Sequence, residues 1–420
     1  MTRRNLQACL GMAFVVAAAG CGSDGGGKTS AGGASANGGT TSDGGTTSDG
    51  GTTSDGGTTT TATTTWNGTW VHPGALDTDA QIAFVRTQLK TSAEPWTFRY
   101  NGLMYAFAIP GAATIPALNN SDPNSKANED AQKQQAQQAY GNALAYRYTD
   151  DTKYADQAVA ILKAWSSVEP YVVYNGTLYQ SMLDCAWIGT LLGPAAELMR
   201  NYMSPADLAQ VQTMFKTVFV PSLSVMDPSN GNRDLTQISA MFSIAVFCED
   251  RDLFDKAQQR LAYRLPGYIY LQSDGTTPKA TIPGASWYSP NFASPNSNGL
   301  MQESCRDFDH HAQYAMAAAL AAAEVAWNQG EDLYGLYQDR LIAGMELLAQ
   351  QMTSGSMQGV CTNGDTTTTD VYDTFEIGYN HYHNVLGLSL PNTAAVLPKI
   401  RANGQSQWNI FYETLTHAGN

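Results

Sequence analysis

The densest run of side chains able to move protons spans residues 300–335, LMQESCRDFDHHAQYAMAAALAAAEVAWNQGEDLYG. As a single helix with 3.6 residues per turn, this run places Arg306, His310 and Tyr314 on one stripe, with Glu303 a turn earlier. Histidine and tyrosine can act as general acids or bases, and arginine can hold a carboxylate. The alternative is a polar cluster without chemistry at the open end of a packed helix, because half-buried polar groups are normally paired.

Polar side chains also precede two other predicted helices. Asn232 and Arg233 lie just before a predicted helix over 234–249 and could donate an amide into a cleft and hold a carboxylate. A turn with a helix cap is the alternative, since Asn-Gly sequences favour turns in any protein. Gln180 and Trp187 could belong to a platform on which a sugar stacks, although aromatic side chains are more often part of a core.

A further cluster, Glu376-Ile-Gly-Tyr-Asn-His-Tyr-His, alternates tyrosine and histidine. Tyr382 is a candidate acid or base, and Tyr379 and His381 are candidates for substrate contact. His381 and His383 could bind a metal on a strand, but no carboxylate has a spacing that supports such a site. We therefore expect no metal and no cofactor.

The composition narrows the range of functions. The 420 residues carry a net charge of −14, which argues against non-specific nucleic-acid binding. An anionic ligand would need positive charge concentrated in a cleft. The sequence contains no glycine-rich phosphate loop, Gly-x-Ser-x-Gly elbow or His-Glu-x-x-His, which removes several large enzyme classes.

Residues 1–21 are typical of a lipoprotein signal peptide. Arg3 and Arg4 provide positive charge, and an apolar stretch of about 10 residues follows, too short to span a bilayer. Ala18-Ala19-Gly20-Cys21 resembles a bacterial lipobox, which implies cleavage before Cys21 and its lipidation. An ordinary secretory signal is the alternative. Either way we expect an exported protein, lipid-anchored to the outer membrane and facing the periplasm or the cell surface if Cys21 is acylated.

Residues 22–65 form the predicted tether. They contain no apolar residue larger than alanine and repeat TTSDGG three times, as flexible coils do. The four cysteines further along, at positions 185, 248, 305 and 361, could be disulfide-bonded or buried as thiols.

Residues 66–420 are the predicted folded domain. Helical periodicity pairs 127–148 with 153–166 and 234–249 with 251–263, each pair joined by a tight turn. Unequal helical hairpins filled with small residues favour an all-α fold, an incomplete (α/α) toroid. An open α-solenoid is the alternative, but it would show clearer repeats.

Several of these segments together resemble the alginate lyase family of polysaccharide lyases. The resemblance rests on Gln-Glu-x-Cys-Arg-Asp and Trp-x-Gln-Gly-x-Asp-Leu-Tyr within 302–335, on 155–166, on Asn230-Gly-Asn with the helix after it, and on 376–382. It implies an (α/α) toroid, an anionic polysaccharide as binding partner and β-elimination at a uronic acid.

Such an elimination needs a neutralised C6 carboxylate, a base for the C5 proton and an acid for the leaving O4. The resemblance implies that Asn232 and Arg306 neutralise the carboxylate and that His310 is the base or a carboxylate partner. Two positions depart from the family: Arg233 follows the asparagine where alginate lyases have histidine, and Gln313 occupies the place of their catalytic tyrosine.

Because Gln313 cannot act as an acid or base, the acid/base role falls to another tyrosine. We assign Tyr314 or Tyr382 as the acid or base. The predicted substrate contacts are Arg233, Gln180, Trp187, Glu303, Tyr379 and His381.

Two other functions remain open from the sequence. One is a glycan-binding lipoprotein on the same fold that has lost its acid/base pair. The other is an (α/α) glycoside hydrolase with a carboxylate pair such as Glu303 and Asp307, although both lie on adjacent turns of the predicted helix. The polymer cleaved, endo or exo action and the oligomeric state do not follow from the sequence.

Overall fold

The computed structural model describes residues 66–111, 129–228, 231–276, 297–305, 308–354 and 370–419, with only the backbone at 308–309. The chain from Thr60 to Asn420 forms one compact unit. The described residues contain helices, turns and isolated β-bridges but no strand. None of the described helices is both long and apolar enough to cross a membrane.

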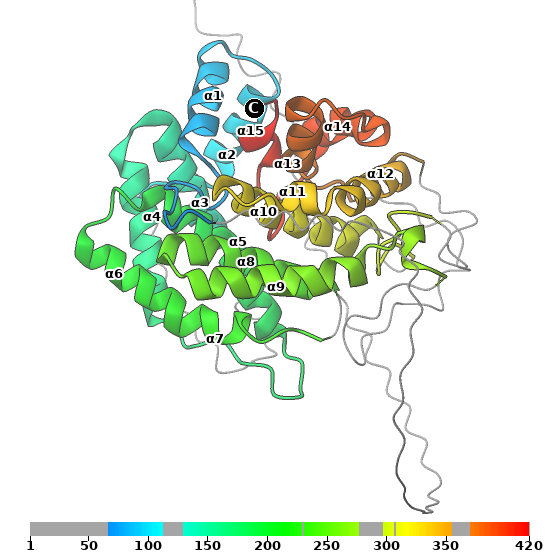
Figure 1. Ribbon diagram of the computed structural model, residues 1–420. Coiled ribbons are helices and arrows are strands. Elements are labelled where there is room, and N and C mark those ends of the chain that lie inside the picture. The colour runs from blue at the N-terminus through cyan, green and yellow to red at the C-terminus, as the bar shows by residue number, and fades with distance from the viewer. Residues whose placement is uncertain are drawn as a thin grey trace, which may run out of the picture. The chain divides into compact units, whose positions relative to one another are not determined.

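Figure 1 labels the α-helices in chain order. The short 3-10 and π-helices between them are written η. Their bounds are α1 (Asp79–Lys90), α2 (Trp96–Ala106), α3 (Glu129–Thr149), α4 (Thr152–Ala164), η1 (Trp165–Ser167), α5 (Gln180–Met199), α6 (Pro205–Met214), η2 (Phe215–Phe219), α7 (Val220–Leu223), α8 (Gly231–Cys248), α9 (Arg251–Tyr268), η3 (Gln272–Asp274), η5 (Phe308–Ala312), α10 (Gln313–Asn328), α11 (Leu333–Leu336), α12 (Gln338–Ser354), α13 (Glu376–Tyr379), η6 (Asn380–Val385), α14 (Pro391–Asn403) and α15 (Glu413–His417).

Helices α5 and α8 lie side by side and run in the same direction. Gly189 of α5 faces Ala240 of α8, and Gly193, one turn on, faces Ser243. A Cβ atom on either glycine would come within 3 Å of the facing side chain, so the small residues permit this close approach. Both helices therefore begin at the same end of the unit.

Helices α3 and α10 begin at that end too. Near the start of α10, the ring of Tyr314 lies 6.2 Å from that of Trp187 in α5. Beyond the other end of α10, Glu331 pairs with Arg251, which follows the end of α8. Lys133, in the second turn of α3, lies 4.6 Å from the ring of Trp408, which stacks on Trp187. The inner helices α3, α5, α8 and α10 are thus parallel.

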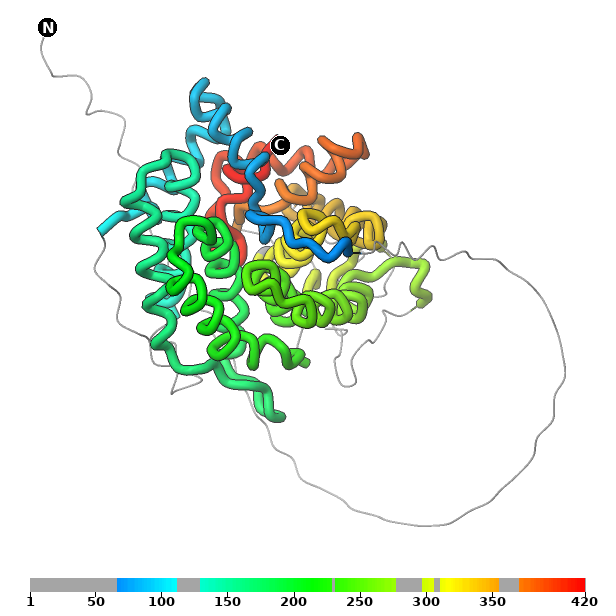
Figure 2. Tube along the Cα trace, turned by 60° about the vertical axis from the view of Figure 1, so that its left-hand side comes forward, coloured from blue at the N-terminus to red at the C-terminus, as the bar shows by residue number. Residues whose placement is uncertain are grey.

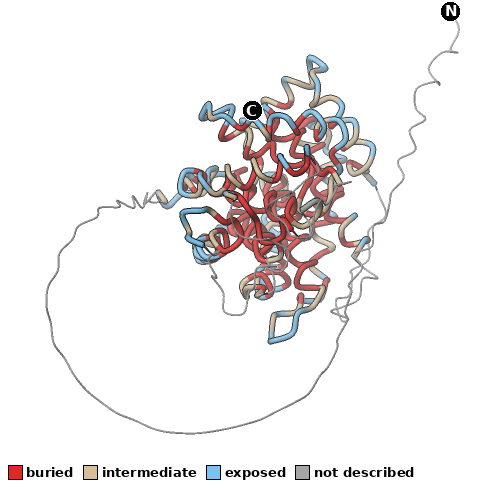
Figure 3. The backbone as a smooth tube through the Cα atoms, turned by 90° about the vertical axis from the view of Figure 1, so that its right-hand side faces the viewer, coloured by how far each residue is buried: buried red, intermediate tan, exposed pale blue. Residues whose placement is uncertain are grey.

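Returning helices cover this inner layer. The tight turn before α4 has Asp150 at φ 60°, and the turn before α9 has Glu249 at φ 53°. Buried segments lie at the centre of the unit (Figure 3). Most residues of the inner helices are buried, including the alanine-rich stretch of α10. Parallel inner helices joined by outer return helices form an (α/α) toroid, so the predicted fold class is confirmed.

The C-terminal segment closes the unit against its first helices. Trp96 donates its indole N–H to the carbonyl of Ala418 at 3.1 Å. Arg99 donates to the carbonyl of Gly404 at 2.7 Å and pairs with the buried carboxylate of Asp373. Figure 2 shows the red C-terminal helices returning to the blue α1 and α2. These contacts bring the segment around Trp408 to the start of the inner helices.

The prediction of one helix over 300–335 is wrong. Residues 302–305 form a turn, the π-helix η5 starts at Phe308, and α10 starts at Gln313. The physical reason is a long-range pairing: Tyr270 donates its N–H to Leu300 at 2.8 Å, and Gln302 donates to the carbonyl of Tyr268 at 2.8 Å. The carbonyl of Leu300 thus accepts from Tyr270 and not from an N–H four residues further on, and Ser304 donates to Met301 in a turn. Glu303 is therefore not on the stripe of His310 and Tyr314.

The described cysteines are of two kinds. Cys185 and Cys248 are buried thiols, and burial raises the pKa of Cys248 to about 12. Cys305 is disulfide-bonded. Cys361 lies outside the described residues.

A carboxyl group is buried near the far end of α10. Glu324 accepts hydrogen bonds from the hydroxyl of Tyr334 at 2.9 Å and from the amide of Gln81 at 2.8 Å. Burial nevertheless raises its pKa from 4.5 to about 7. Because the folded state binds this proton more tightly than the unfolded state does, the stability from Glu324 is present below pH 4.5 and is lost as pH rises to 7.

We expect Glu324→Gln to stabilise the protein at neutral and higher pH. A pKa raised from 4.5 to about 7 corresponds to about 3 kcal/mol in the free energy of unfolding above pH 7. Urea unfolding at pH 8 should show the variant as more stable than the wild type, and the difference should vanish near pH 4. A gain of equal size at both pH values would contradict this account.

Candidate active site

The candidate active site is the end of the toroid where α3, α5, α8 and α10 begin. The first turns of these helices leave backbone N–H groups unpaired within the helix and carry partial positive charge. Parallel inner helices add these partial charges at one end, which favours an anionic ligand there. The side chains that the described structure places at this end are Lys133, Gln180, Asp184, Trp187, Asn232, Arg233, Glu303, His310, Gln313, Tyr314, Asp370, Tyr372 and Trp408.

His310 lies in a compact polar cluster. Its Nδ1 is 2.7 Å from the hydroxyl of Tyr372 and 3.2 Å from Oδ2 of Asp370. The Tyr372 hydroxyl also donates to Oδ2 of Asp370 at 3.1 Å. Side-chain exposure is 18% for His310 and 38% for Asp370, so the cluster is open to solvent at these residues. An imidazole in this environment can accept and return a proton.

Two tyrosine rings pack beside His310. Tyr314 stacks on Tyr372 with ring centroids 5.3 Å apart and an interplanar angle of 14°. The ring of His310 meets that of Tyr314 edge-on at 4.8 Å. Burial raises the pKa of Tyr372, with smaller contributions from Tyr314 and Asp370 in the same direction. Tyr372 is therefore held in its protonated form.

Gln313 fixes the segment that carries this cluster. Its side-chain amide donates to the carbonyl of Asp370 at 3.2 Å, and its Oε1 accepts from the backbone N–H of Tyr372 at 3.2 Å. A glutamine can make both contacts because its amide has a donor and an acceptor. This chain therefore uses the amide of Gln313 to hold Tyr372 beside His310.

An aromatic stack lies next to this cluster. Trp187 and Trp408 stack with centroids 4.4 Å apart at 10°, and Lys133 lies 4.6 Å from the Trp408 ring. Asn409 donates to the backbone carbonyl of Tyr314 at 2.9 Å, which fixes the segment of Trp408 against α10. Trp187 therefore lies beside Tyr314 and Trp408, and Lys133 adds a half-buried positive charge.

Asn232 and Glu303 contact each other in the interior. The Asn232 amide donates to Glu303 Oε1 at 2.8 Å, and the Tyr268 hydroxyl donates to Oε2 at 2.8 Å. Asn232 is 1% exposed and Glu303 is fully buried. Gly231 completes the junction, because a Cβ atom there would overlap the ring of Tyr268. The structure thus gives Asn232 a carboxylate partner within the protein.

Arg233 and Gln180 lie at the starts of neighbouring helices. Arg233 pairs with Asp227 at 2.5 Å and donates to the carbonyl of Tyr179 at 3.1 Å. Gln180 donates to Asp184 at 3.0 Å. Both side chains have partners within the protein, and their contact with a substrate stays a prediction.

Tyr379, His381 and Tyr382 are not brought to the His310 cluster, contrary to the roles in acid/base chemistry and substrate contact that the sequence predicted for them. Tyr382 is fully buried and donates its hydroxyl to the carbonyl of Tyr334 at 3.0 Å, while His381 stacks on the Tyr334 ring at 3.8 Å. Tyr334 follows α10, whereas His310 precedes it. The 16 residues of α10 separate the two groups by about 24 Å at 1.5 Å per residue.

The paired histidines of this segment do not converge either. His383 stacks on Tyr379 and its Nδ1 contacts the carbonyl of Leu388 at 2.8 Å. Burial lowers the pKa of His381 to about 4. Among the described residues no group of three or more His, Cys, Asp or Glu side chains could hold a metal ion.

Some predicted residues cannot be placed. Arg306, Asp307 and the lipidation site Cys21 lie outside the described residues. Conversely, no sequence pattern indicated Asp370, Tyr372, Trp408 or Lys133 as site residues. Tyr372 is far from His310 along the chain and belongs to no motif that carries chemistry, so only the fold reveals the contact.

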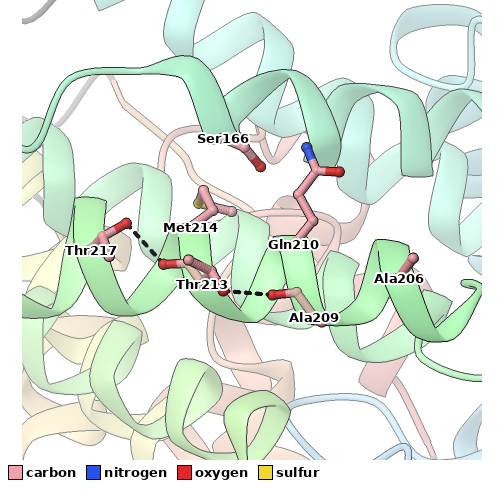
Figure 4. Close-up of a pocket in the computed structure, with 7 residues that line it drawn as sticks. All are labelled: Ser166, Ala206, Ala209, Gln210, Thr213, Met214 and Thr217. Carbon is pink, nitrogen blue, oxygen red and sulfur yellow. Dashed lines mark hydrogen bonds between the residues drawn. The ribbon is translucent and has the colours of Figure 1, made fainter.

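A hollow on the outer surface lies between η1 and α6 (Figure 4). Its lining has no titratable side chain, and the hydroxyls of Thr213 and Thr217 bond back to carbonyls of their own helix. It offers no chemistry comparable to that of the His310 cluster.

Comparison with known proteins assigns the family. The family model described as alginate lyase matches residues 110–357, more than half of the chain. The chain belongs to the alginate lyase family. This assignment confirms the resemblance inferred from the sequence.

Solved structures of alginate lyases share the fold. A histidine-to-alanine variant of alginate lyase A1-III, an enzyme of Sphingomonas species A1, complexed with a tetrasaccharide, is 15% identical with a TM-score of 0.51. The match covers 76% of this chain and 91% of that one. An alginate lyase from Bacteroides ovatus is 14% identical with a TM-score of 0.51, over 83% of this chain and 100% of its own. No curated protein matches the sequence significantly.

Proposed function

We propose that this member of the alginate lyase family is a polysaccharide lyase that cleaves a uronate-containing polysaccharide by β-elimination. The observation that carries the proposal is the position of His310. Its imidazole is partly exposed, contacts a carboxylate and a tyrosine hydroxyl, and lies where the inner helices begin. A structural relative of the same fold is complexed with a tetrasaccharide, which supports an oligosaccharide as the ligand class.

His310 serves as the base in this proposal. It removes the C5 proton of the uronate while the electron pair forms the C4–C5 double bond and the C4–O4 bond breaks. Tyr314, whose ring contacts His310 and whose side chain is 1% exposed, then gives its proton to O4 once substrate binding has uncovered its hydroxyl. Tyr382 has no part in this step, because its hydroxyl is bonded to Tyr334 near the other end of α10.

The C6 carboxylate must be neutralised for the C5 proton to become acidic. Asn232 and Arg306 keep this role as sequence-based predictions, and the first turn of α8 adds partial positive charge around Asn232. The contact between Asn232 and Glu303 holds the asparagine at the first turn of α8. Substrate binding would have to share or replace this contact.

Lys133 is expected to attract a neighbouring uronate in the polymer. Replacing Lys133 with alanine should raise KM about tenfold with little change in kcat, since a charge contact of roughly 1.4 kcal/mol corresponds to that factor. Steady-state kinetics at low and high salt would measure it, and the effect should shrink in high salt. Lys153→Ala, which removes an exposed lysine in the first turn of α4, beyond the far end of α3, is the matched control. Equal KM values for the two variants would contradict this role.

The hydrolase alternative loses its proposed carboxylate pair. Glu303 is fully buried and accepts hydrogen bonds from Asn232 and Tyr268, so it does not flank a substrate bond. Inverting and retaining hydrolases need two carboxyl groups that face the scissile bond.

A substrate panel tests the proposal. Alginate, polyglucuronate and pectic polymers are incubated with the protein, and ultraviolet absorbance follows the double bond conjugated to the C6 carboxylate. We expect absorbance to rise with at least one polymer. Binding of anionic oligosaccharides without any rise would instead establish a glycan-binding protein on the same fold.

We propose that this activity is located outside the cytoplasm. The disulfide at Cys305 supports export, because disulfides form in oxidising compartments. Cell fractionation should place the protein in the envelope fraction, and a purely cytoplasmic protein would contradict export.

A further inference from the structure

Three polar atoms meet at the partly exposed edge of the candidate active site. They are Nδ1 of His310, the hydroxyl oxygen of Tyr372 and Oδ2 of Asp370, and the distances between them are 2.7, 3.1 and 3.2 Å. Each pair is within hydrogen-bond distance. The positions of the protons in this triangle decide which nitrogen of His310 can accept another proton.

The chemistry of the carboxylate fixes those positions. An ionised Asp370 can only accept, so both contacts to it need a hydrogen on the other atom. The Tyr372 hydroxyl gives its one hydrogen to Asp370, which leaves the Tyr372 oxygen to accept from Nδ1–H of His310. The opposite tautomer would turn the Nδ1 lone pair towards the carboxylate at 3.2 Å, which is repulsive.

We propose that Asp370 and Tyr372 are positioning residues that hold neutral His310 as the Nδ1–H tautomer, with Nε2 as its proton-accepting atom. The role of His310 as base rests on the proposed function. The tautomer of His310 does not depend on that function. A carboxylate and a hydroxyl on one ring nitrogen orient the ring and raise the basicity of the other nitrogen. In the elimination, Nε2 takes the C5 proton, and Asp370 stabilises the imidazolium that forms.

The rest of the cluster supports this arrangement. The amide of Gln313 holds the backbone of both Asp370 and Tyr372, and the stacked ring of Tyr314 restricts Tyr372. The other described titratable groups around His310 are Tyr314 and His311, whose rings lie 4.8 and 5.1 Å from its own. Asp370 is therefore the carboxylate that the described structure places on the ring.

Nitrogen NMR of the histidine side chains tests the tautomer without any assay of activity. The chain has six histidines, so selective labelling with heavy nitrogen gives few signals, and His310→Asn identifies the signal of residue 310. We expect neutral His310 to be Nδ1-protonated in the wild type. In the double variant Asp370→Ala, Tyr372→Phe it should change to the Nε2–H form that free histidine prefers.

Kinetics provide a second measurement. Asp370→Ala should move the acid limb of the pH profile of kcat/KM to lower pH by about one unit, because a half-exposed carboxylate no longer stabilises the imidazolium. Tyr372→Phe keeps the ring stack and should lower kcat with a smaller shift. Asp252→Asn removes an exposed carboxylate at the start of α9 and should leave the profile unchanged.

The outcomes separate the two proposals. An Nε2–H tautomer in the wild type, or an unchanged acid limb in Asp370→Ala, would overturn the inference. If the double variant does not fold, the single variant Asp370→Ala gives the same NMR comparison, because the Tyr372 hydroxyl can then donate to Nδ1 and leave the proton on Nε2. Absence of lyase activity in the wild type would contradict the proposed function. The NMR measurement would still test the tautomer of His310.

Discussion

Replacing His310 with alanine is expected to lower kcat of the lyase reaction by about 100- to 10,000-fold, the usual contribution of a positioned acid or base. The expected loss follows from the geometry. His310 is the described imidazole that is partly exposed at the start of the inner helices and contacts a carboxylate. KM should change little, because alanine removes a proton acceptor and leaves the neighbouring aromatic stack in place.

The control for this variant is His383→Ala. His383 is exposed, stacks on Tyr379 and lies with its segment beyond the other end of α10. Initial rates measured by ultraviolet absorbance should stay close to wild type for His383→Ala. If His310→Ala keeps more than about a tenth of the wild-type kcat, the loss is smaller than the contribution of a general base. That result would contradict the assignment of His310.

Replacing Asp234 with alanine is expected to lower the free energy of unfolding by about 3–5 kcal/mol, the usual cost of removing one partner of a buried ion pair. Asp234 is fully buried in the first turn of α8 and pairs with Arg260 and with Arg264, the latter at 2.8 Å. Both guanidinium groups are almost completely buried. Without the carboxylate, two buried positive charges would share only neutral partners such as Gln237 and the carbonyl of Asp227.

Urea unfolding would measure this effect, with Asp252→Ala as the control at an exposed position of α9. We expect the control to change stability by less than about 0.5 kcal/mol. Because Asp234 follows Asn232 and Arg233 in the same turn, the variant should also lose activity as the start of α8 loosens. A loss of less than about 1 kcal/mol would contradict the view that this ion pair holds α8 in place.

The toroid could be predicted from the sequence because helices and tight turns leave patterns in residues that are close together along the chain. Hairpins such as α3–α4 and α8–α9 combine helical periodicity with tight turns, and alanine in α10 indicates close packing. The helix over 300–335 failed for the opposite reason. Its first residues pair with Tyr268 and Tyr270, and no local pattern reveals a backbone contact made by residues so far away in the chain.

The candidate site shows the same division. His310, Tyr314 and Trp187 could be found from residue type and spacing, and the structure brings them together. Tyr382 has equally suitable chemistry but lies near the wrong end of α10, because spacing along a sequence does not say which end of a distant helix a segment packs against. Tyr372 reaches His310 only through the fold.

The most direct test of the central claim is mass spectrometry of the products formed in water labelled with heavy oxygen. Elimination breaks the C4–O4 bond without adding water. We therefore predict a new chain end with a C4–C5 double bond and no heavy oxygen in either product. Saturated products that carry heavy oxygen at the new reducing end would show hydrolysis and contradict the claim that this protein is a lyase.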